Sequence, residues 1–188
     1  RYTLNPAFLC EAPDTILFEE DAVLADTYLW NFGDGNTLLV EQGSGSGLYN
    51  WTKNGTLLST DTTEINPLHE YLVPGIYDTQ LQVTNTLSGC TDSMNIIVNV
   101  AKMNLGFTQD TVSTCQYLGV AFTDTTIINT DFTITNWEWD FGDGTPRING
   151  AFPNPTHMYG ASGLFDVTLV VTNSIGCTDS IVQPNFIT

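Results

Sequence analysis

Two carboxylates in the second half of the chain are the pair best placed for general acid–base chemistry. Asp140 and Asp143 lie close together in sequence, but no nucleophile or general acid recurs near them. Asp residues beside glycines are common acceptors in tight turns, which explains both side chains better. The kinase-like Asp-Phe-Gly at 140–142 has no Gly-rich loop, Lys-bearing strand or catalytic-loop motif around it. We therefore predict that the chain is not an enzyme.

Clustered acidic side chains raise the alternative of a metal site. The densest group consists of Glu19, Glu20, Asp21 and Asp26, and oxygen ligands of this kind bind calcium. The chain has no Asp-x-Asp-x-Asp-Gly loop, and acidic residues on a protein surface commonly serve solubility. Calcium at these four residues is therefore the less favoured interpretation, and no other cofactor is predicted.

The balance of charge excludes nucleic acid as a partner. The 188 residues include 21 Asp and Glu but only 4 Lys and Arg, a formal net charge of −17. Such a surface repels phosphate and cannot supply the counterion release that drives nucleic-acid binding. Membrane insertion is not expected, because the longest apolar runs, such as 96–98 and 169–171, are far too short for a spanning helix.

The elements that position these residues are predicted to be strands. Thr is the commonest residue, whereas Lys, Arg and Ala are scarce, a composition that favours pleated strands over helices. Residues 77–84 alternate apolar with polar side chains, as do most of residues 165–172, which is typical of half-buried strands. We predict an all-β protein.

The sequence contains one unit twice, since three motifs recur in the same order. The first copies are Trp30-Asn31-Phe32-Gly33-Asp34-Gly35, Asn66-Pro67-Leu68-His69-Glu70-Tyr71 and Gly89-Cys90-Thr91-Asp92-Ser93. The second copies are Trp139-Asp140-Phe141-Gly142-Asp143-Gly144, Asn154-Pro155-Thr156-His157-Met158-Tyr159 and Gly176-Cys177-Thr178-Asp179-Ser180. We predict two domains, residues 1–102 and 103–188, joined by a short connector.

An insertion distinguishes the first unit from the second. It lies at about residues 36–61 and contains an Asn-Gly pair, Asn54-Gly55, of the kind that favours a type I′ hairpin turn. We predict an extra β-ribbon here. Its aromatic residues Tyr49 and Trp51 are candidates for stacking on a glycan or protein ligand, although ordinary packing of the ribbon onto the first unit is the favoured interpretation.

Each unit has one cysteine near its start and one near its end. Pairing within the units would join Cys10 to Cys90 and Cys115 to Cys177 and leave no free thiol. Four cysteines allow three connectivities, and only this one respects the duplication. Disulfides imply an oxidising compartment, so we expect a secreted or surface protein. Four buried free thiols are the alternative, and a zinc site is less favoured because no Cys-x-x-Cys pair exists.

The repeated motifs carry a family resemblance. Trp-x-Phe-Gly-Asp-Gly, Asn-Pro-x-His-x-Tyr, Gly-x-Tyr/Phe and a Val/Leu-x-Val-Thr-Asn strand resemble the PKD (polycystic kidney disease) domain, in both units. The resemblance implies two tandem Ig-like β-sandwiches of the PKD type from an extracellular protein. The added cysteines resemble PKD repeats in surface and secreted proteins of Bacteroidetes-type bacteria. Some PKD modules of secreted proteases bind calcium, but the first unit departs from the pattern, since Asn31 replaces the Asp found at 140.

Physical reasoning gives the motif residues structural roles. The tryptophans sit where one strand can bury an indole between two sheets, and the aspartates between glycines can accept backbone N–H groups in a turn. We expect the tyrosines to close the far end of the core and the histidines beside them to be hydrogen-bonded rather than catalytic. The residues concerned are Trp30, Asp34, His69, Tyr71, Trp139, Asp143, His157 and Tyr159.

A recurring triplet, Asp followed by Ser or Thr and then an apolar residue or Thr, resembles the O-glycosylation signal of Bacteroidetes. The resemblance implies glycans on the middle hydroxyl. The alternative is that a Thr-rich strand protein produces such triplets by chance. The candidate hydroxyls are those of Thr15, Thr62, Ser93, Thr111, Thr125 and Ser180.

We therefore predict a non-catalytic structural and adhesive module, a spacer or fibre-forming part of a larger bacterial cell-surface or secreted protein. The first alternative is a glycan- or protein-binding accessory module of a secreted hydrolase, and the second is a subunit of an extracellular filament, because exposed sandwich edges can accept another chain's strand. The expected partners are other domains or copies of the same protein, and surface glycans or proteins. The chain opens and stops in strand-like segments, as an excerpt from an array would.

Overall fold

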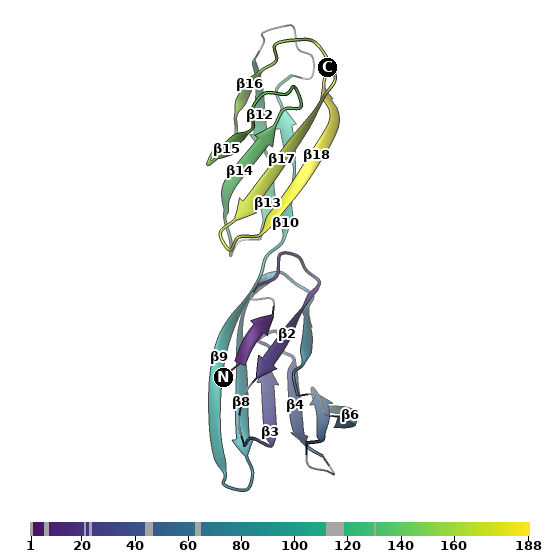
Figure 1. Cartoon of the computed structure of the whole chain (residues 1–188), viewed down its shortest axis with the longest axis vertical. Helices are drawn as coiled ribbons and strands as arrows, with labels where there is room; N and C mark the ends of the chain where they lie inside the picture. Colours follow the sequence, from purple (N-terminus) through teal and green to yellow (C-terminus); the bar gives the residue numbers. More distant parts are fainter. Residues whose placement is uncertain are drawn as a thin grey trace. The chain divides into compact units, whose positions relative to one another are not determined.

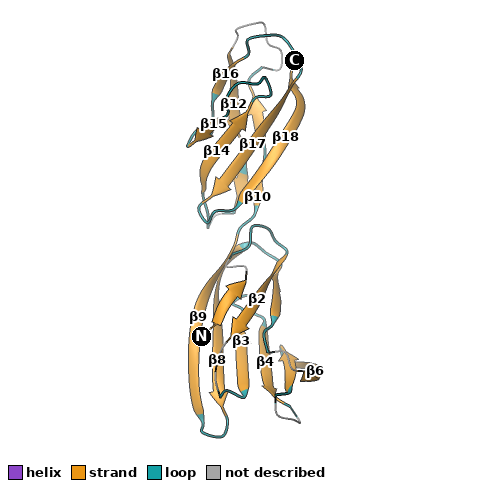
Figure 2. Ribbon diagram, in the orientation of Figure 1, coloured by secondary structure: helices purple, strands orange, loops and turns teal. Residues whose placement is uncertain are grey.

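The computed structural model describes residues 2–5, 8–20, 22, 24–43, 47–62, 65–111, 119–129 and 131–188. Within these ranges every regular element is a β-strand, which confirms the predicted all-β fold (Figure 2). Accordingly, the described residues contain no helix that is long and apolar enough to cross a membrane. The chain divides into two compact units, residues 1–100 and 101–188, called here the first and second unit.

The first unit consists of two antiparallel sheets. The smaller has the order β1-β2-β7 and the larger the order β6-β5-β4-β3-β8-β9 (Figure 1). The strands are β1 Tyr2–Asn5, β2 Asp14–Glu20, β3 Thr27–Asn31, β4 Thr37–Gln42, β5 Tyr49–Lys53, β6 Thr56–Thr62, β7 Leu68–Tyr71, β8 Gly75–Asn85 and β9 Cys90–Val100.

The second unit repeats this plan with shorter sheets. It has a sheet of order β11-β12-β16, a sheet of order β15-β14-β17-β18, and the small pair β10-β13. The strands are β10 Met103–Asn104, β11 Phe107–Gln109, β12 Gly119–Asp124, β13 Ile127–Ile128, β14 Ile134–Asp140, β15 Ile148–Gly150, β16 Thr156–Met158, β17 Phe165–Asn173 and β18 Thr178–Ile187.

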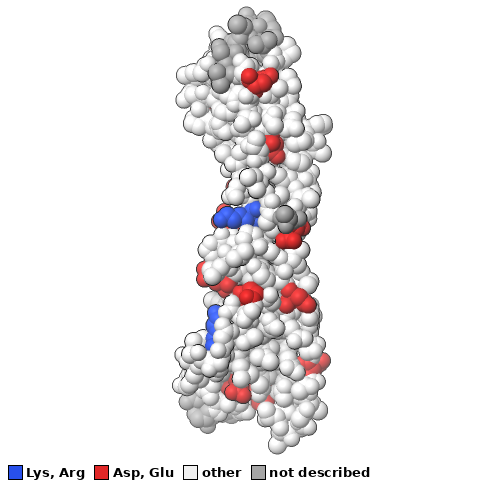
Figure 3. Space-filling model, turned by 180° about the vertical axis from the view of Figure 1, so that it is seen from behind, with Lys and Arg blue, Asp and Glu red and all other residues white. Residues whose placement is uncertain are grey.

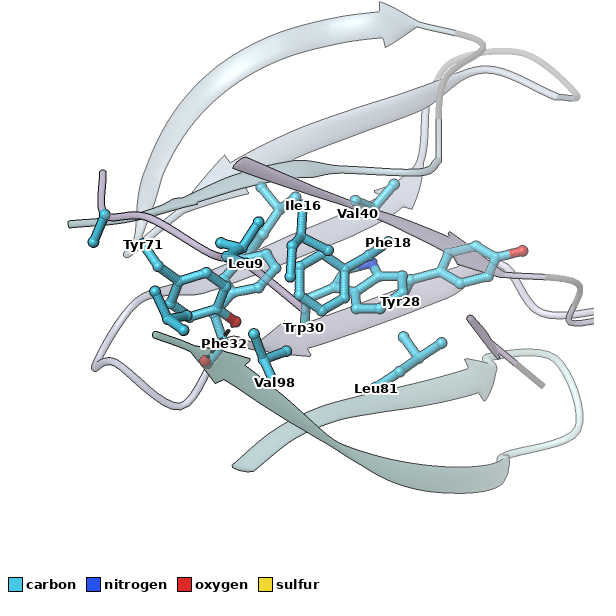
Figure 4. Close-up of a cluster of buried hydrophobic side chains, with 13 residues drawn as sticks. Leu9, Ile16, Phe18, Tyr28, Trp30, Phe32, Val40, Tyr71, Leu81 and Val98 are labelled. Carbon is cyan, nitrogen blue, oxygen red and sulfur yellow. Dashed lines mark hydrogen bonds between the residues drawn. The ribbon is translucent and has the colours of Figure 1, made fainter. Parts of the chain in front are cut away.

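Alternating side chains build the core of each unit. On β17, Val167, Leu169 and Val171 are fully buried, and the residues between them are less so. In the first unit, Trp30 of β3 is buried against Phe18 of β2, with the ring centroids 5.5 Å apart (Figure 4). Period-two patterning thus places one large indole of each unit in the core, since Trp139 is equally buried.

The insertion of the first unit extends its larger sheet. Strands β4 and β5 pair in register, and β5 and β6 are joined by the turn at Asn54-Gly55. Asn54 has φ 48° and Gly55 φ 79°, the left-handed conformations that a type I′ turn requires. Strand β6 therefore forms one edge of the six-stranded sheet, and β9 forms the other.

The cysteines contradict the predicted pairing. Cys90 is a free and exposed thiol, whereas Cys10 and Cys177 are both disulfide-bonded. The expected Cys10–Cys90 pair is therefore wrong. The expected Cys115–Cys177 pair stays a prediction, because Cys115 lies outside the described residues.

Strand β9 explains why the first pairing fails. The backbone N–H of Leu9 donates to the carbonyl of Asn99 at 2.9 Å, so Cys10 follows a segment tied to the end of β9. Cys90 is the first residue of the same strand. A strand of this length separates its ends by roughly 30 Å, whereas the two Cα atoms of a disulfide lie about 5.5 Å apart. Sequence position near the two ends of a repeat did not mean proximity in space.

Candidate functional site

A glycine-flanked turn positions the most conspicuous carboxylate of each unit. In the first unit, Gly33 and Gly35 have φ values of 79° and 91° and allow the chain to fold back around Asp34. A Cβ atom on Gly33 would lie 2.7 Å from the carbonyl oxygen of Asp78, so only glycine fits there. The Asn31 side chain accepts the Gly33 N–H at 3.0 Å and fixes the entry to the turn.

The first unit has Asn31 where the second unit has Asp140, and this difference does not change the turn. In the second unit, Asp140 Oδ1 accepts the N–H of Gly142 at 3.0 Å, the same bond that Asn31 makes. Asp140 additionally accepts a bond from Arg147 Nε at 3.0 Å. Asn and Asp are therefore interchangeable as acceptors at this position, and only the link to Arg147 is specific to the second unit.

The turn presents Asp34 to a histidine that is far away in sequence. The Nε2 atom of His69, on β7, lies 2.9 Å from Asp34 Oδ2. The same carboxylate accepts the backbone N–H and the side-chain N–H of Asn36, each at 2.9 Å. The His69 side chain is only 2% exposed, so this bond is shielded from water. The structure thus unites two residues whose pairing the sequence did not indicate.

The second unit contains the same pair with the same geometry. His157 Nε2 lies 2.8 Å from Asp143 Oδ2, and both side chains are largely buried. Thr145 takes the place of Asn36, because its N–H and hydroxyl both donate to Asp143 Oδ1, at 3.1 and 2.6 Å. The duplication therefore extends from the sequence motifs to a buried Asp–His hydrogen bond.

Aromatic rings enclose each histidine. The ring of His69 stacks on Phe32 with centroids 3.9 Å apart, and Tyr71 packs against it edge-on at 4.8 Å. The Tyr71 hydroxyl donates to the carbonyl of Phe32 at 3.0 Å. In the second unit the equivalent contacts, among Phe141, His157 and Tyr159, have centroid distances of 4.0 and 4.7 Å and a hydroxyl bond of 3.3 Å. The tyrosines therefore close this end of the core.

Burial and hydrogen bonding set the charges of the cluster. Burial lowers the pKa of His69 below its ordinary value, and the neighbouring Asp34 opposes this only in part. Burial alone would raise the pKa of Asp34, but the bonds from Asn36 and His69 outweigh it and lower the pKa overall. The pair is therefore a carboxylate that accepts a hydrogen bond from a neutral imidazole at neutral pH.

This arrangement supports a structural role rather than proton transfer. An Asp–His pair can orient a general base, but such a base needs its second nitrogen or an exposed ring edge beside a nucleophile. Here Nε2 is bonded to the aspartate, Phe32 covers a ring face, and the His69 side chain is buried. The pair links the β3–β4 turn to β7, which joins the two sheets of the unit.

The family follows from comparison of the whole chain with known proteins. Family profiles described as PKD domain match residues 5–98 and residues 107–188. The chain belongs to the PKD domain family. Human Polycystin-1 is 25% identical over 181 residues, which are 90% of this chain and 4% of the length of Polycystin-1. The predicted family and the tandem Ig-like arrangement are confirmed.

Two solved structures also align with the tandem PKD chain. The fibronectin(III)-like modules of Clostridium thermocellum CbhA are 14% identical, with coverage of 97% of this chain and 92% of that chain and a TM-score of 0.42. Murine CEACAM1b is 8% identical, with coverage of 97% and 96% and a TM-score of 0.48.

Membership of the PKD family indicates a general type of function. PKD domains are typically non-catalytic modules that take part in protein–protein or carbohydrate interactions. The family and the disulfide together indicate an extracellular type of module. The bacterial, Bacteroidetes-type origin stays a prediction.

The two aromatic residues of the insertion contribute to packing. Tyr49 and Trp51 are half-buried on β5 and pack against the core of the first PKD unit. The ring of Tyr49 meets Tyr28 edge-on at 5.9 Å. These contacts agree with packing of the ribbon onto the first unit, and a ligand contact at Tyr49 or Trp51 stays a prediction.

A surface hollow lies beside the Asp–His pair of the first unit. Its volume is about 420 Å³, and its lining includes Asp34 and His69 together with Tyr77 and, from the insertion, Lys53. The Asp34–His69 pair therefore lines one side of an open depression in the surface. Lys53 adds a positive charge that slightly opposes protonation of His69.

Two of the four residues predicted for calcium, Glu20 and Asp26, accept hydrogen bonds from other residues of the first unit. The Asp26 carboxylate accepts the backbone N–H of Thr86 at 3.0 Å and its hydroxyl at 2.7 Å, and the hydroxyl bond is the main reason why its pKa is lowered. Glu20 accepts the N–H of Ala22 at 2.5 Å. Across the described part of the chain, no group of three or more His, Cys, Asp or Glu is placed to hold a metal. Asp21 lies outside the described residues.

Acidic side chains are distributed over the surface. On the face drawn in Figure 3 they lie in small separate groups among uncharged residues. Of the predicted O-glycosylation hydroxyls, four are exposed and two, Thr62 and Thr111, are half-buried. Modification at these positions stays a prediction. The four exposed ones are Thr15, Ser93, Thr125 and Ser180.

Sequence reasoning missed the phenylalanines of the motif and the second ring layer. Phe32 and Phe141 hold the histidines in place, and Tyr77 packs on Tyr71 with centroids 4.5 Å apart. The signal was present in the sequence, because Phe follows the tryptophan by two positions in both copies, the spacing that puts two side chains on the same face of an extended chain.

Proposed function

We propose that the two PKD units form a non-catalytic structural and adhesive module that spaces other domains of a larger extracellular protein or builds a fibre from its copies. The observation that carries this proposal is that each unit uses its conspicuous Asp–His pair to close its own core, with the same bond in both units. Because these Asp and His side chains form hydrogen bonds within their own unit, they support a rigid fold. Recognition of a partner would then depend on exposed strands and loops.

The connection between the first and last segments of each unit supports a load-bearing role. In the first unit the N–H of Leu9 donates to Asn99 on the last strand, β9. In the second unit, Gln109 Nε2 on β11 donates to the carbonyl of Phe186 on β18 at 3.3 Å. Gln183 Nε2 donates in return to the carbonyl of Phe107 at 3.2 Å. Tension applied to the ends of a unit therefore meets bonded strands rather than a loose terminus.

Single-molecule stretching of the reduced chain tests this function. We expect two separate cooperative unfolding steps, one for each unit, because each unit has its own core. Gradual lengthening without steps would contradict a rigid spacer. A polysaccharide-binding assay on the same protein addresses the accessory-module alternative, which predicts binding that is lost in a Trp51→Ala variant.

A further inference from the structure

The last strands of the two units form equivalent edges of their larger sheets. Strand β9 lies at one edge of the six-stranded sheet, and β18 lies at one edge of the four-stranded sheet (Figure 1). The repeated Gly-Cys-Thr-Asp-Ser motif aligns the two strands, so that Ile97 of β9 matches Pro184 of β18. An edge strand presents unpaired N–H and C=O groups to which another chain can bind.

Backbone bonds show which groups of β9 point away from the sheet. The carbonyl of Asn99 accepts the N–H of Leu9, which lies outside the sheet, so the backbone groups of Asn99 point outward. Because this direction alternates along a strand, the groups of every second residue before Asn99, including Ile97, point outward too. The neighbouring Ile96 agrees with this alternation, since its carbonyl accepts the hydroxyl of Thr79 from β8 at 2.6 Å.

The second unit blocks its edge at the equivalent outward position. Pro184 has no N–H, and the next residue, Asn185, has φ 50° and donates its N–H to Asp166 at 2.8 Å, which interrupts the extended strand. The pairing of β17 with β18 also shifts register at this point. A proline and an irregular register are devices by which natural sheets prevent pairing with another chain. Strand β18 is therefore a protected edge.

Strand β9 has neither device. Its pairing with β8 runs without a shift from Cys90 to Val100, and it contains no proline. The Ile97 side chain is 49% exposed, and among the described residues Leu9 is the only one outside the sheet that forms a backbone bridge with β9. The opposite edge of the same sheet, β6, is interrupted by register shifts against β5. The first unit thus leaves β9 as a long, regular and open edge.

The charges of β9 favour a second copy of this chain as the partner. The chain has a formal net charge of −17, so two copies repel each other over most of their surfaces. Asp92 is the one charged residue of β9, and residues 93–100 are all uncharged. Edges that avoid pairing commonly carry charged side chains. An uncharged edge on an acidic protein is therefore the place where two copies can approach each other.

We propose that two copies of the chain associate through β9, which pairs antiparallel with β9 of the other copy and joins the two six-stranded sheets. Because Leu9 occupies the edge beside Asn99, the pairing is centred near Met94 on a two-fold axis. In that register the two Met94 side chains, each 42% exposed in the single chain, meet, and Asp92 lies opposite Ile96 of the other copy. The inference rests on the proposed function and deepens it, because it names a strand through which copies associate.

Sedimentation equilibrium measures this association. All proteins compared carry Cys90→Ser, which excludes dimers joined through the exposed thiol. We expect the parent chain to form a reversible dimer whose fraction rises with protein concentration. Ile97→Pro removes an outward N–H from each copy and gives β9 the residue that β18 has at this position. We expect this variant to dimerise roughly tenfold more weakly, because two backbone hydrogen bonds are lost in each dimer.

Ile97→Thr is the matched control. It removes the exposed apolar side chain but keeps the N–H, and Thr is well suited to strands. We expect it to dimerise as the parent chain does. Equal weakening by Thr and Pro would assign the association to an apolar contact and overturn the backbone pairing. Absence of a dimer, or equal dimerisation of all three proteins, would also overturn it.

Amide hydrogen exchange of the unsubstituted protein gives a result that does not depend on the folding of any variant. We expect exchange at the N–H groups of Asn95 and Ile97 to slow as the protein concentration rises. Exchange at Val182, which matches Asn95 on the protected edge β18, should stay constant. Exchange at Asn95 and Ile97 that is independent of concentration would refute the β9 pair. It would leave the spacer function intact if stretching still shows two unfolding steps, so the two failures are distinguishable.

Discussion

At the scale of single residues, side chains of types that often act in catalysis form buried hydrogen bonds within each unit. Asp34 and His69 satisfy each other's polar atoms inside an aromatic enclosure, and Asp143 and His157 repeat the arrangement. A buried hydrogen bond of this kind is costly to leave half-made, because the remaining partner loses water without a replacement. The pair therefore specifies where the turn after β3 must lie.

Removal of one partner should destabilise the first unit. Asp34→Ala leaves the buried Nε2 of His69 without its acceptor, and we expect a loss of about 1–3 kcal/mol in the free energy of unfolding. Urea titration followed by tryptophan fluorescence measures it. Asp131→Ala, which removes an exposed carboxylate, is the control and should change stability little. Equal effects of the two substitutions would show that the Asp–His bond contributes nothing.

The stability of the first unit should fall on acidification. Because burial lowers the pKa of His69 below its ordinary value of 6.5, the unfolded chain binds a proton that the folded unit does not. Stability is then complete above about pH 6.5 and declines as the pH falls below it. The lowered pKa of Asp34 adds a further loss below its ordinary value of 3.8.

Urea midpoints measured between pH 8 and pH 5 test this dependence. A His69→Gln variant keeps a side-chain N–H for Asp34 but cannot titrate. We expect the variant to lose less stability than the wild-type protein over this interval. A variant that follows the wild-type curve would assign the pH dependence to other groups.

The two glycines of the first turn should differ in their response to a methyl group. Both have positive φ, so Gly35→Ala should cost about 1 kcal/mol through backbone strain alone. Gly33→Ala adds a collision, because its Cβ would lie 2.7 Å from the backbone oxygen of Asp78. We expect Gly33→Ala to be clearly the more destabilising of the two in thermal denaturation. The reverse order would mean that the turn relaxes away from Asp78.

At the scale of elements, strand pairing converts a sequence insertion into additional sheet. The residues between Gly35 and Asn66 form β4, β5 and β6, and the ribbon packs Tyr49 and Trp51 against the core of the first unit. The second unit reaches the same sandwich plan with the short strand β15 beside β14. The ribbon therefore widens a sheet that the motif residues already define.

Truncation of Trp51 should weaken packing of this ribbon. For Trp51→Ala we expect a loss of about 1–3 kcal/mol in the unfolding free energy, less than for a fully buried Trp because the ring is half-buried. Leu57→Ala, on β6 and 58% exposed, is the control and should have a smaller effect. If the Trp51→Ala protein were as stable as the wild-type protein, packing would not require this side chain, and the result would favour a role of Trp51 in binding.

At the scale of the whole molecule, the chain consists of two compact PKD units, and each unit has its own buried core and its own Asp–His hydrogen bond. Each unit therefore carries within itself the contacts that stabilise its fold.

Much of the fold was predictable from the sequence because its signals are local. Alternation along 77–84 and 165–172 predicts strands, and recurrence of the Trp-x-Phe-Gly-Asp-Gly motif predicts two copies of one sandwich. The turn at Asn54-Gly55 follows from the conformations that Asn and Gly tolerate. Burial of the two tryptophans follows from the same alternation, since every second side chain on a strand faces the core.

Only the tertiary structure decided which distant residues meet. The bond between Asp34 and His69 depends on how the turn after β3 approaches β7, which no local pattern encodes. The disulfide was predicted wrongly for a related reason: a repeat shows which cysteines are equivalent but not at which end of the sandwich each one lies. Strand β9 places Cys10 and Cys90 too far apart to bond with each other, because the segment that carries Cys10 pairs with the end of β9 whereas Cys90 begins it.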